Sequence, residues 1–163
     1  AGLTGPGCAA YVAQNPKGAS SVPGMSNVGL ATAISKNSLL TTLNSAISGK
    51  LNKKVDLTGT LDGGDYTIFA PVDSAFAKLS EKATKKLKDD DQYLVKALTY
   101  HVITGRLTPE QVVGKQKSVQ GGDLKVTRAR GMLQVDGANV VCGGMKTVNA
   151  DVYLIDTVLN PPK

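Results

Sequence analysis

Tryptophan is absent from this sequence, and its 163 residues include only two phenylalanines and five tyrosines. The core must therefore be built from aliphatic side chains, which suffice for one domain of this length. No run of 18 apolar residues occurs, so no transmembrane helix is predicted. The first seven residues lack the charged and apolar regions of a signal peptide, and we expect a mature form from which an export signal was removed.

Motifs for catalysis and for metal or cofactor binding are also missing. The only histidine is His101, and no acids lie at a spacing that would complete a zinc site. The sequence contains no phosphate-binding glycine loop, dinucleotide fingerprint or nucleophile elbow. We therefore predict a non-enzymatic protein without catalytic residues, metal site or cofactor. His101 has two interpretations: a core histidine bonded to a carbonyl or carboxylate, or a pH-sensitive, partner-facing residue.

The two cysteines, Cys8 and Cys142, are far apart and form no C-x-x-C pair. They either pair with each other or remain as two buried thiols of a cytosolic protein. We favour pairing, which indicates an oxidising compartment. The chain-entropy model gives a loop of this length about 5 kcal/mol of stabilisation.

Basic residues outnumber acidic ones by 19 to 13, for a net charge of +6. Such a charge favours anionic partners, which include nucleic acid, acidic glycans and lipid headgroups. The densest basic run consists of Lys78, Lys82, Lys85, Lys86 and Lys88. Three aspartates, residues 89–91, follow this run and no aromatic residue interrupts it. We interpret it as a solvated helix face and predict no nucleic-acid partner.

The apolar pattern changes along the chain. Residues 1–27 are predicted to form an arm, and residues 28–163 a single domain. Helical spacing dominates as far as Gly114, and a period of two follows it. The predicted strands span residues 124–128, 132–135, 138–142, 147–150 and 152–159. Asp136 and Gly137 predict a hairpin turn of the primed type. Helices followed by antiparallel strands define an α+β domain.

Residues 66–76 combine a strand, a turn and the start of a helix. Tyr66 to Phe69 are β-formers, Pro71 ends the strand, and Asp73 is expected to cap a short helix. Further on, apolar spacing from residue 93 to residue 102 predicts a helix that stops near residue 105. Thr108 and Pro109 predict another brief helix that runs to residue 114.

Three stretches resemble, in order, the signatures of fasciclin-like (FAS1) domains. They are residues 66–76, the pair Tyr100–His101 and residues 149–162, and the resemblance covers residues 28–162. It implies a wedge-shaped antiparallel β-sandwich flanked by several short helices. The signature positions, all with an expected structural role, are Thr67, Phe69, Ala70, Pro71, Asp73, Phe76, Asn149 and Asp156.

Residues 1–26 add a resemblance to the major secreted antigens of mycobacteria, which are single FAS1 domains with one disulfide. This resemblance implies a bridge between Cys8 and Cys142 and a secreted, extracellular protein, either free or associated with the cell wall. In animal members the region around the Tyr-His pair is linked to integrin binding. Tyr100 and His101 are therefore the candidates for a partner-binding region.

Together these features predict a secreted, monomeric interaction module that is antigenic. Its expected partner is a protein or glycan at a cell surface or matrix, and its expected role is cell adhesion or host contact. The alternative is a carrier, in which the wedge between sheet and helices holds a small apolar ligand such as a cell-wall lipid.

Overall fold

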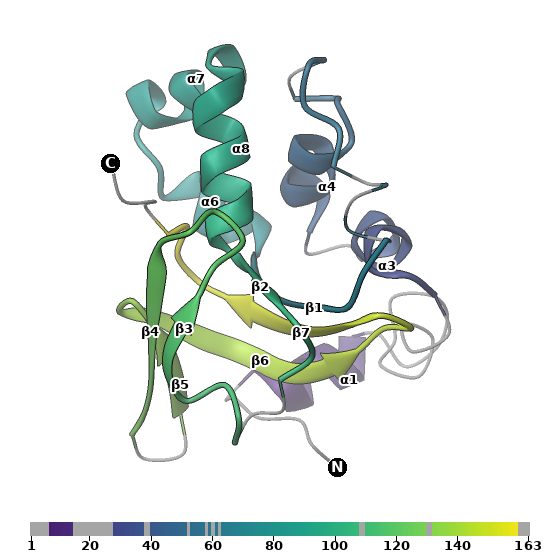
Figure 1. Cartoon of the computed structure of the whole chain (residues 1–163), viewed down its shortest axis with the longest axis vertical. Helices are drawn as coiled ribbons and strands as arrows, with labels where there is room; N and C mark the ends of the chain where they lie inside the picture. Colours follow the sequence, from purple (N-terminus) through teal and green to yellow (C-terminus); the bar gives the residue numbers. More distant parts are fainter. Residues whose placement is uncertain are drawn as a thin grey trace.

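The computed structural model describes residues 7–14, 28–37, 40–51, 53–57, 59, 61, 63–107, 110–129 and 132–159. Within these ranges the helices are α1 (Cys8–Gln14), α3 (Leu30–Lys36), α4 (Thr41–Ile47), α6 (Asp73–Ala77), α7 (Glu81–Asp89) and α8 (Asp91–Tyr100). The strands are β1 (Tyr66–Pro71), β2 (Val102–Thr104), β3 (Gly114–Lys117), β4 (Asp123–Ala129), β5 (Met132–Val135), β6 (Ala138–Lys146) and β7 (Ala150–Ile155). Helices α3 to α8 gather on one side of the strands (Figure 1). The α+β class is confirmed.

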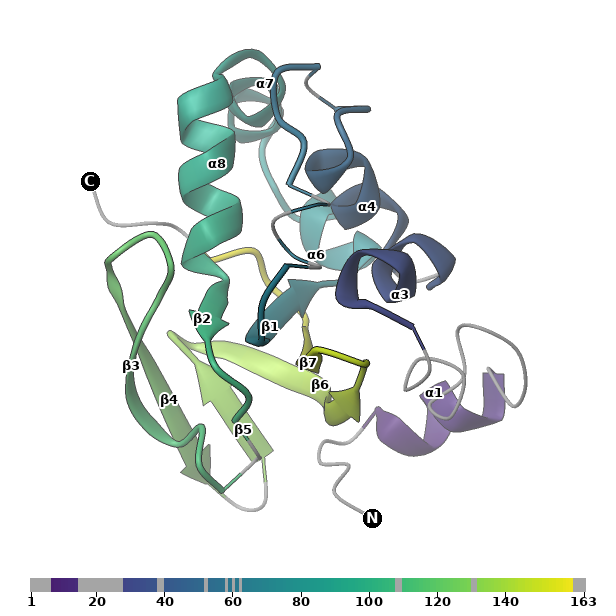
Figure 2. The same ribbon diagram turned by 45° about the vertical axis from the view of Figure 1, so that its right-hand side comes forward.

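The strands of the described residues form one seven-stranded sheet in the order β2-β1-β7-β6-β5-β4-β3. Neighbours run antiparallel except for β1 and β7, which are parallel. The register of β6 against β7 shifts between Val140 and Met145, an irregularity that bends a sheet. A bridge between Ile103 and Ser118 connects the two edges. The sheet therefore curls until its edge strands nearly meet (Figure 2).

The two faces of the sheet bury two hydrophobic clusters, because successive side chains of a strand point to opposite faces. On β7, Val152 and Leu154 belong to the cluster beneath the helices. Tyr153 and Ile155 belong to the cluster inside the barrel, where Phe69 of β1 lies 5.5 Å from Tyr153 between ring centroids. Both clusters thus depend on the same central strands.

The signature segment builds the junction between β1 and its surroundings. Thr67 is fully buried; its hydroxyl donates to Gly105 O (2.7 Å) and accepts from Leu107 N–H (2.9 Å). Phe69 and Ala70 are also fully buried, on opposite faces of the strand. Thr67 therefore anchors β1 to the segment 105–107, while Ala70 and Phe69 anchor it in the two hydrophobic clusters.

Asp73 does not have the capping role expected from the sequence. The N-cap of α6 is Val72, and Asp73 is the first helical residue. Its Oδ1 accepts from Thr42 N–H (2.8 Å), and its Oδ2 accepts from the Thr41 hydroxyl (2.5 Å). Asp73 therefore caps α4, a helix some 30 residues earlier, whose own N-cap Leu40 makes no side-chain cap bond.

Asn149 joins three segments of the chain. Its Oδ1 accepts from Leu30 N–H (2.9 Å) at the start of α3. Its Nδ2 donates to Leu61 O (2.7 Å) and Gly64 O (2.6 Å), which precede β1. One amide thus satisfies backbone groups that the turn between β6 and β7 brings together.

The remaining signature residues also make internal contacts. Pro71 ends β1 opposite Ile155 of β7. Phe76 of α6 packs against the cluster beneath the helices. Asp156 Oδ1 accepts from Asn139 N–H (3.0 Å) and so ties the end of β7 to β6.

Helix α1 is fastened to β6 by a disulfide between Cys8 and Cys142, which confirms the predicted pairing. Beside it, Gly7 N–H donates to Val141 O (2.8 Å). A Cβ on residue 7 would lie 2.3 Å from the Val141 side chain, so only glycine permits this approach. Tyr11 of α1 is buried in the cluster beneath the helices. Residues 1–6 and 15–27 lie outside the described ranges, so the division into an arm (1–27) and a domain (28–163) stays a prediction.

Some predicted elements differ from the observed ones. The helix expected to stop near residue 105 ends at Tyr100, and Val102 begins β2. Residues 110–113 form a turn and a bend instead of helix, while Thr108 and Pro109 lie outside the described residues. The predicted strand 152–159 corresponds to β7, which ends at Ile155, whereas residues 147–149 of the other predicted strand form the turn before β7. Strand β3 was not predicted.

Candidate functional site

His101 directly follows α8 and is 3% exposed. Its Nε2 accepts a hydrogen bond from Leu159 N–H (2.9 Å), and its Nδ1 lies 2.5 Å from Ala97 O. An acceptor at Nε2 and a carbonyl at Nδ1 require a neutral ring with its proton on Nδ1. Burial lowers the pKa of His101 from 6.5 to about 4, although the Ala97 carbonyl and the charge of Asp136 oppose the shift.

Tyr100 is 4% exposed and points into the barrel. Its hydroxyl is bonded to the Asp136 carboxylate and lies 3.0 Å from Asp123 O. Burial, followed by the nearby Asp136 carboxylate, raises the pKa of Tyr100 above its ordinary value. Asp136 and Gly137 both have positive φ (48° and 86°), as the predicted primed turn requires. Tyr100 thus fastens this turn to α8.

Neither residue of the predicted partner-binding region faces solvent, because both side chains use their polar atoms inside the protein. Of the two interpretations of His101, its buried position and its bonds to backbone groups agree with the core histidine. A partner that docks on this part of the chain would instead contact exposed neighbours such as Val119, which is 43% exposed.

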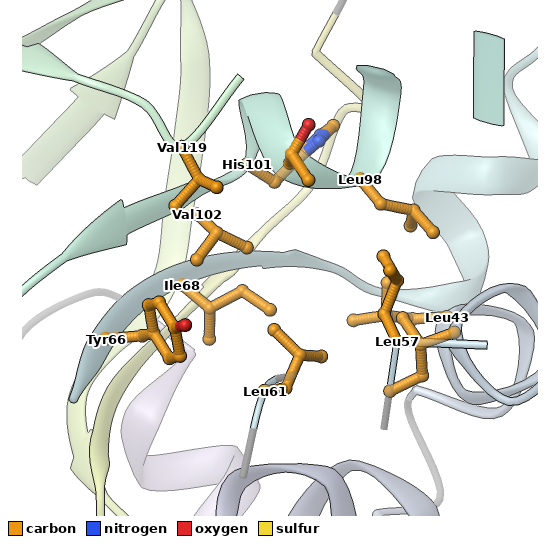
Figure 3. Close-up of a pocket in the computed structure, with 11 residues that line it drawn as sticks. Leu43, Leu57, Leu61, Tyr66, Ile68, Leu98, His101, Val102 and Val119 are labelled. Carbon is orange, nitrogen blue, oxygen red and sulfur yellow. The ribbon is translucent and has the colours of Figure 1, made fainter. Parts of the chain in front are cut away.

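An apolar pocket lies between β1 and helices α4 and α8 (Figure 3). Its walls include Leu43 and Ile47 of α4, Ile68 of β1 and Leu98 of α8, and Val119 brings it to the surface. The empty volume is about 440 Å³ with open solvent included, and about 30 Å³ can hold the centre of a water-sized sphere. The other described residues around it are Leu57, Leu61, Tyr66, Thr99, His101 and Val102.

The pocket offers little polar chemistry. Thr99 Oγ1 donates to Val95 O (2.7 Å), and both ring nitrogens of His101 are bonded to backbone groups. Tyr66 is half-buried and contributes the remaining hydroxyl. No charged side chain is present among the described lining residues. A charged ligand group would lose hydration here without gaining a partner, so the walls suit an uncharged apolar group.

The best-formed charged cluster elsewhere in the described residues serves the fold. Arg106 Nη2 pairs with Asp151 (3.1 Å) and also donates to the carbonyls of Thr147 (2.9 Å) and Ala150 (3.1 Å). It therefore closes the turn between β6 and β7. In the described part of the chain, no group of three or more His, Cys, Asp or Glu side chains could hold a metal ion.

The inward Tyr-His pair, the interlocking signature residues and the curled sheet are features of one class of domain. The Fasciclin domain family matches residues 30–161, and the chain belongs to this family. The cell surface glycolipoprotein MPB83 of Mycobacterium bovis is 52% identical over 162 residues, which cover 99% of this chain and 74% of that protein. The immunogenic protein MPB70 of Mycobacterium bovis is 49% identical over 160 residues, covering 98% of this chain and 83% of the relative.

A solved structure shows the same fold. The FAS1 domain pair of the insect cell adhesion molecule Fasciclin I matches with a TM-score of 0.67 at 16% identity. The match covers 83% of this chain and 52% of that chain, so this chain spans about half of the pair. At this low identity the likeness concerns the fold alone, and it confirms the predicted FAS1 architecture.

The relatives bear the names of surface proteins and antigens, and their names denote no enzyme. With the disulfide between Cys8 and Cys142, this relationship identifies the chain as a secreted, extracellular protein of the mycobacterial antigen type. None of the helices described above is long and apolar enough to cross a membrane.

Proposed function

We propose that this domain acts outside the cell as a carrier that binds an apolar molecule between β1, α4 and α8. The observation that carries the proposal is the pocket lined by Leu43, Ile68 and Leu98, which reaches the surface at Val119. Apolar side chains that line a concave site on a folded domain are typical of ligand pockets. This is the wedge between sheet and helices that the carrier interpretation requires.

The narrow space constrains the ligand. Since only about 30 Å³ admits the centre of a water-sized sphere, the occupant is a thin apolar chain rather than a ring system. Its polar end remains near Tyr66 and Val119, where the lining residues are half-buried or exposed. A lipid with a single inserted chain satisfies both conditions.

Binding can be tested with two exposed valines. Val119→Lys places a charge at the pocket mouth, whereas Val148→Lys places the same charge on the turn between β6 and β7, outside the pocket. Titration with methyl parinarate, a neutral fluorescent dye with a single straight chain, should show about a tenfold weaker affinity for the Val119 variant only, because an ammonium group disfavours apolar burial. Both variants should keep the wild-type melting temperature, since each site is exposed.

Native mass spectrometry of protein purified from its own source gives a second measurement. A retained apolar molecule that disappears from the Val119→Lys protein supports the carrier. A bare mass, or equal dye binding by both valine variants, contradicts it.

The second candidate is an interaction module that contacts a protein or glycan in adhesion or host contact. Two observations favour it: the relatives are named as a cell surface glycolipoprotein and an immunogenic protein, and several lysines of α7 are exposed. Pull-down from host or envelope extracts, with Val119→Lys as a comparison, separates a surface partner from a pocket ligand. Loss of the partner in that variant would assign the contact to the pocket mouth.

A further inference from the structure

Helix α7 presents a dense row of positive charge. Four lysines fall within its nine residues, and all are exposed. At 3.6 residues per turn they lie on the side opposite Leu87, which is buried. We call this surface the lysine face, and it consists of Lys82, Lys85, Lys86 and Lys88.

This arrangement is unfavourable for an isolated helix. Lys82 is four residues from Lys86 and three from Lys85, and each such like-charge pair slightly destabilises the helix. Neither Lys82 nor Lys85 forms an ion pair with a residue in the described ranges. Lys86 lies over the ring of Tyr93, 4.2 Å from its centroid, so its stem packs while the charge stays outside. Lys82 and Lys85 are therefore accessible to an anionic partner from solvent.

The surface around the lysine face is hollowed on two sides. One hollow of about 530 Å³ is lined by Lys82, Lys85 and Lys86 together with the aspartates at 89–91. The other, of about 330 Å³, is lined by Leu79, which precedes α7, and by Glu81, Thr84, Lys85 and Lys88 of α7. Lys85 borders both hollows, so an elongated molecule that runs along the helix past Lys85 meets lysines on either side.

We propose that the lysine face binds an acidic polysaccharide. The extracellular setting supplies such polymers, and the spacing from Lys82 to Lys88, about 9 Å along the axis, matches several negative groups on one chain. Nucleic acid is disfavoured because α7 itself carries no aromatic residue, and the nearby Tyr93 ring lies beneath Lys86 instead of being open for stacking with bases. A bilayer is disfavoured because the large exposed apolar residues in the described ranges, Val12, Val113, Val119 and Val148, are not on α7.

The aspartates define where binding stops. Asp90 is engaged as the N-cap of α8, accepting from Tyr93 N–H (3.1 Å). Asp89 is the last residue of α7 and follows the lysines directly. It repels an anion, so the polysaccharide lies along the N-terminal part of the helix. The proposal gives the interaction module a partner class and does not depend on the apolar pocket.

Heparin serves as the probe for the test. Lys82→Gln with Lys85→Gln removes two charges from the lysine face, and Lys36→Gln with Lys146→Gln removes two from exposed positions on α3 and β6. The first pair should lower heparin affinity about tenfold at fixed salt, while the second pair leaves it within about twofold. Asp89→Asn should strengthen binding. All variants should remain folded, with urea midpoints at or slightly above the wild-type value, since Lys82→Gln and Lys85→Gln remove like-charge repulsion.

Equal weakening by the two double variants would overturn the proposal, because net charge alone would then explain retention. Failure of the wild type to bind heparin would overturn it as well. Sedimentation with phosphatidylglycerol vesicles and binding of a DNA oligonucleotide test the other anions, and a preference for either one over heparin contradicts the assignment. Since methyl parinarate binding reports the pocket separately, failure here leaves the carrier proposal intact.

Discussion

His101 shows how one buried side chain makes stability depend on pH. Its folded-state pKa of about 4 lies below the ordinary 6.5, so the unfolded chain binds the proton more readily than the folded one. Its contribution is therefore complete above pH 6.5 and is lost as the pH falls towards 4. The full difference is about 3 kcal/mol, since one pKa unit corresponds to about 1.4 kcal/mol.

Urea unfolding of the wild type and of His101→Gln at pH 7 and pH 4.5 measures this contribution. The variant should be less stable at pH 7, because the bond to Leu159 N–H is weakened, but its stability should fall less between the two pH values. Parallel loss of stability in both proteins would show that other groups cause the acid sensitivity.

The sequence identified individual residues with a structural role, such as Asp73 and His101, but not the residues that they contact. Asp73 was recognised as a cap but assigned to the wrong helix, because local spacing carries no information about Thr41 and Thr42. For His101 the core interpretation was available, yet its partner Leu159 lies 58 residues away. Long-range partners of short polar side chains are decided by packing.

At the scale of elements, helix α4 depends on a carboxylate from α6. Asp73→Ala leaves Thr42 N–H without its acceptor and should cost about 1–2 kcal/mol, the usual value of an N-cap. Asp73→Asn retains an acceptor and should cost less. Ser74→Ala, at the exposed neighbouring position, should change the free energy of unfolding by less than about 0.5 kcal/mol. Urea denaturation compares the three variants, and equal effects of Asp73→Ala and Ser74→Ala would rule out the cap.

The elements that the sequence did not predict are strands whose conformation depends on pairing with a neighbouring strand. Val102 continues the apolar helical spacing, but it pairs with Ile68 of β1 and so begins a strand. The segment 114–117 is short and polar, and it is a strand because it pairs with β4. The apolar spacing from residue 93 to residue 102 predicted the helix that carries Leu98, whereas the incomplete cover that makes Leu43 and Leu98 pocket walls follows from the placement of α4 and α8.

For the whole molecule, the disulfide connects residues 134 positions apart. Cys8→Ala with Cys142→Ala should lower the free energy of unfolding by about 2–5 kcal/mol. We expect the arm (1–27) to detach while the domain (28–163) stays folded, with faster hydrogen exchange in α1 and a retained β-sheet circular dichroism spectrum. Unchanged exchange in α1 would show that Gly7 and Tyr11 hold the helix without the bridge.

The fold as a whole could be predicted because the Tyr66–Phe76, Tyr100–His101 and C-terminal motifs occur in order. These motifs consist of residues that interlock with backbone groups, as Thr67 and Asn149 do. The functional surfaces could not be derived in the same way, since pocket walls and lysines resemble ordinary core and surface residues. Only the arrangement of these residues in the folded protein distinguishes them from ordinary core and surface residues.

The parallel pairing of β1 and β7 governs the order in which this protein can mature. β7 is the last strand of the described chain to be synthesised, yet it lies in the middle of the sheet, between β1 and β6. Until it emerges, neither hydrophobic cluster can close, and the nascent polypeptide remains without a stable tertiary structure.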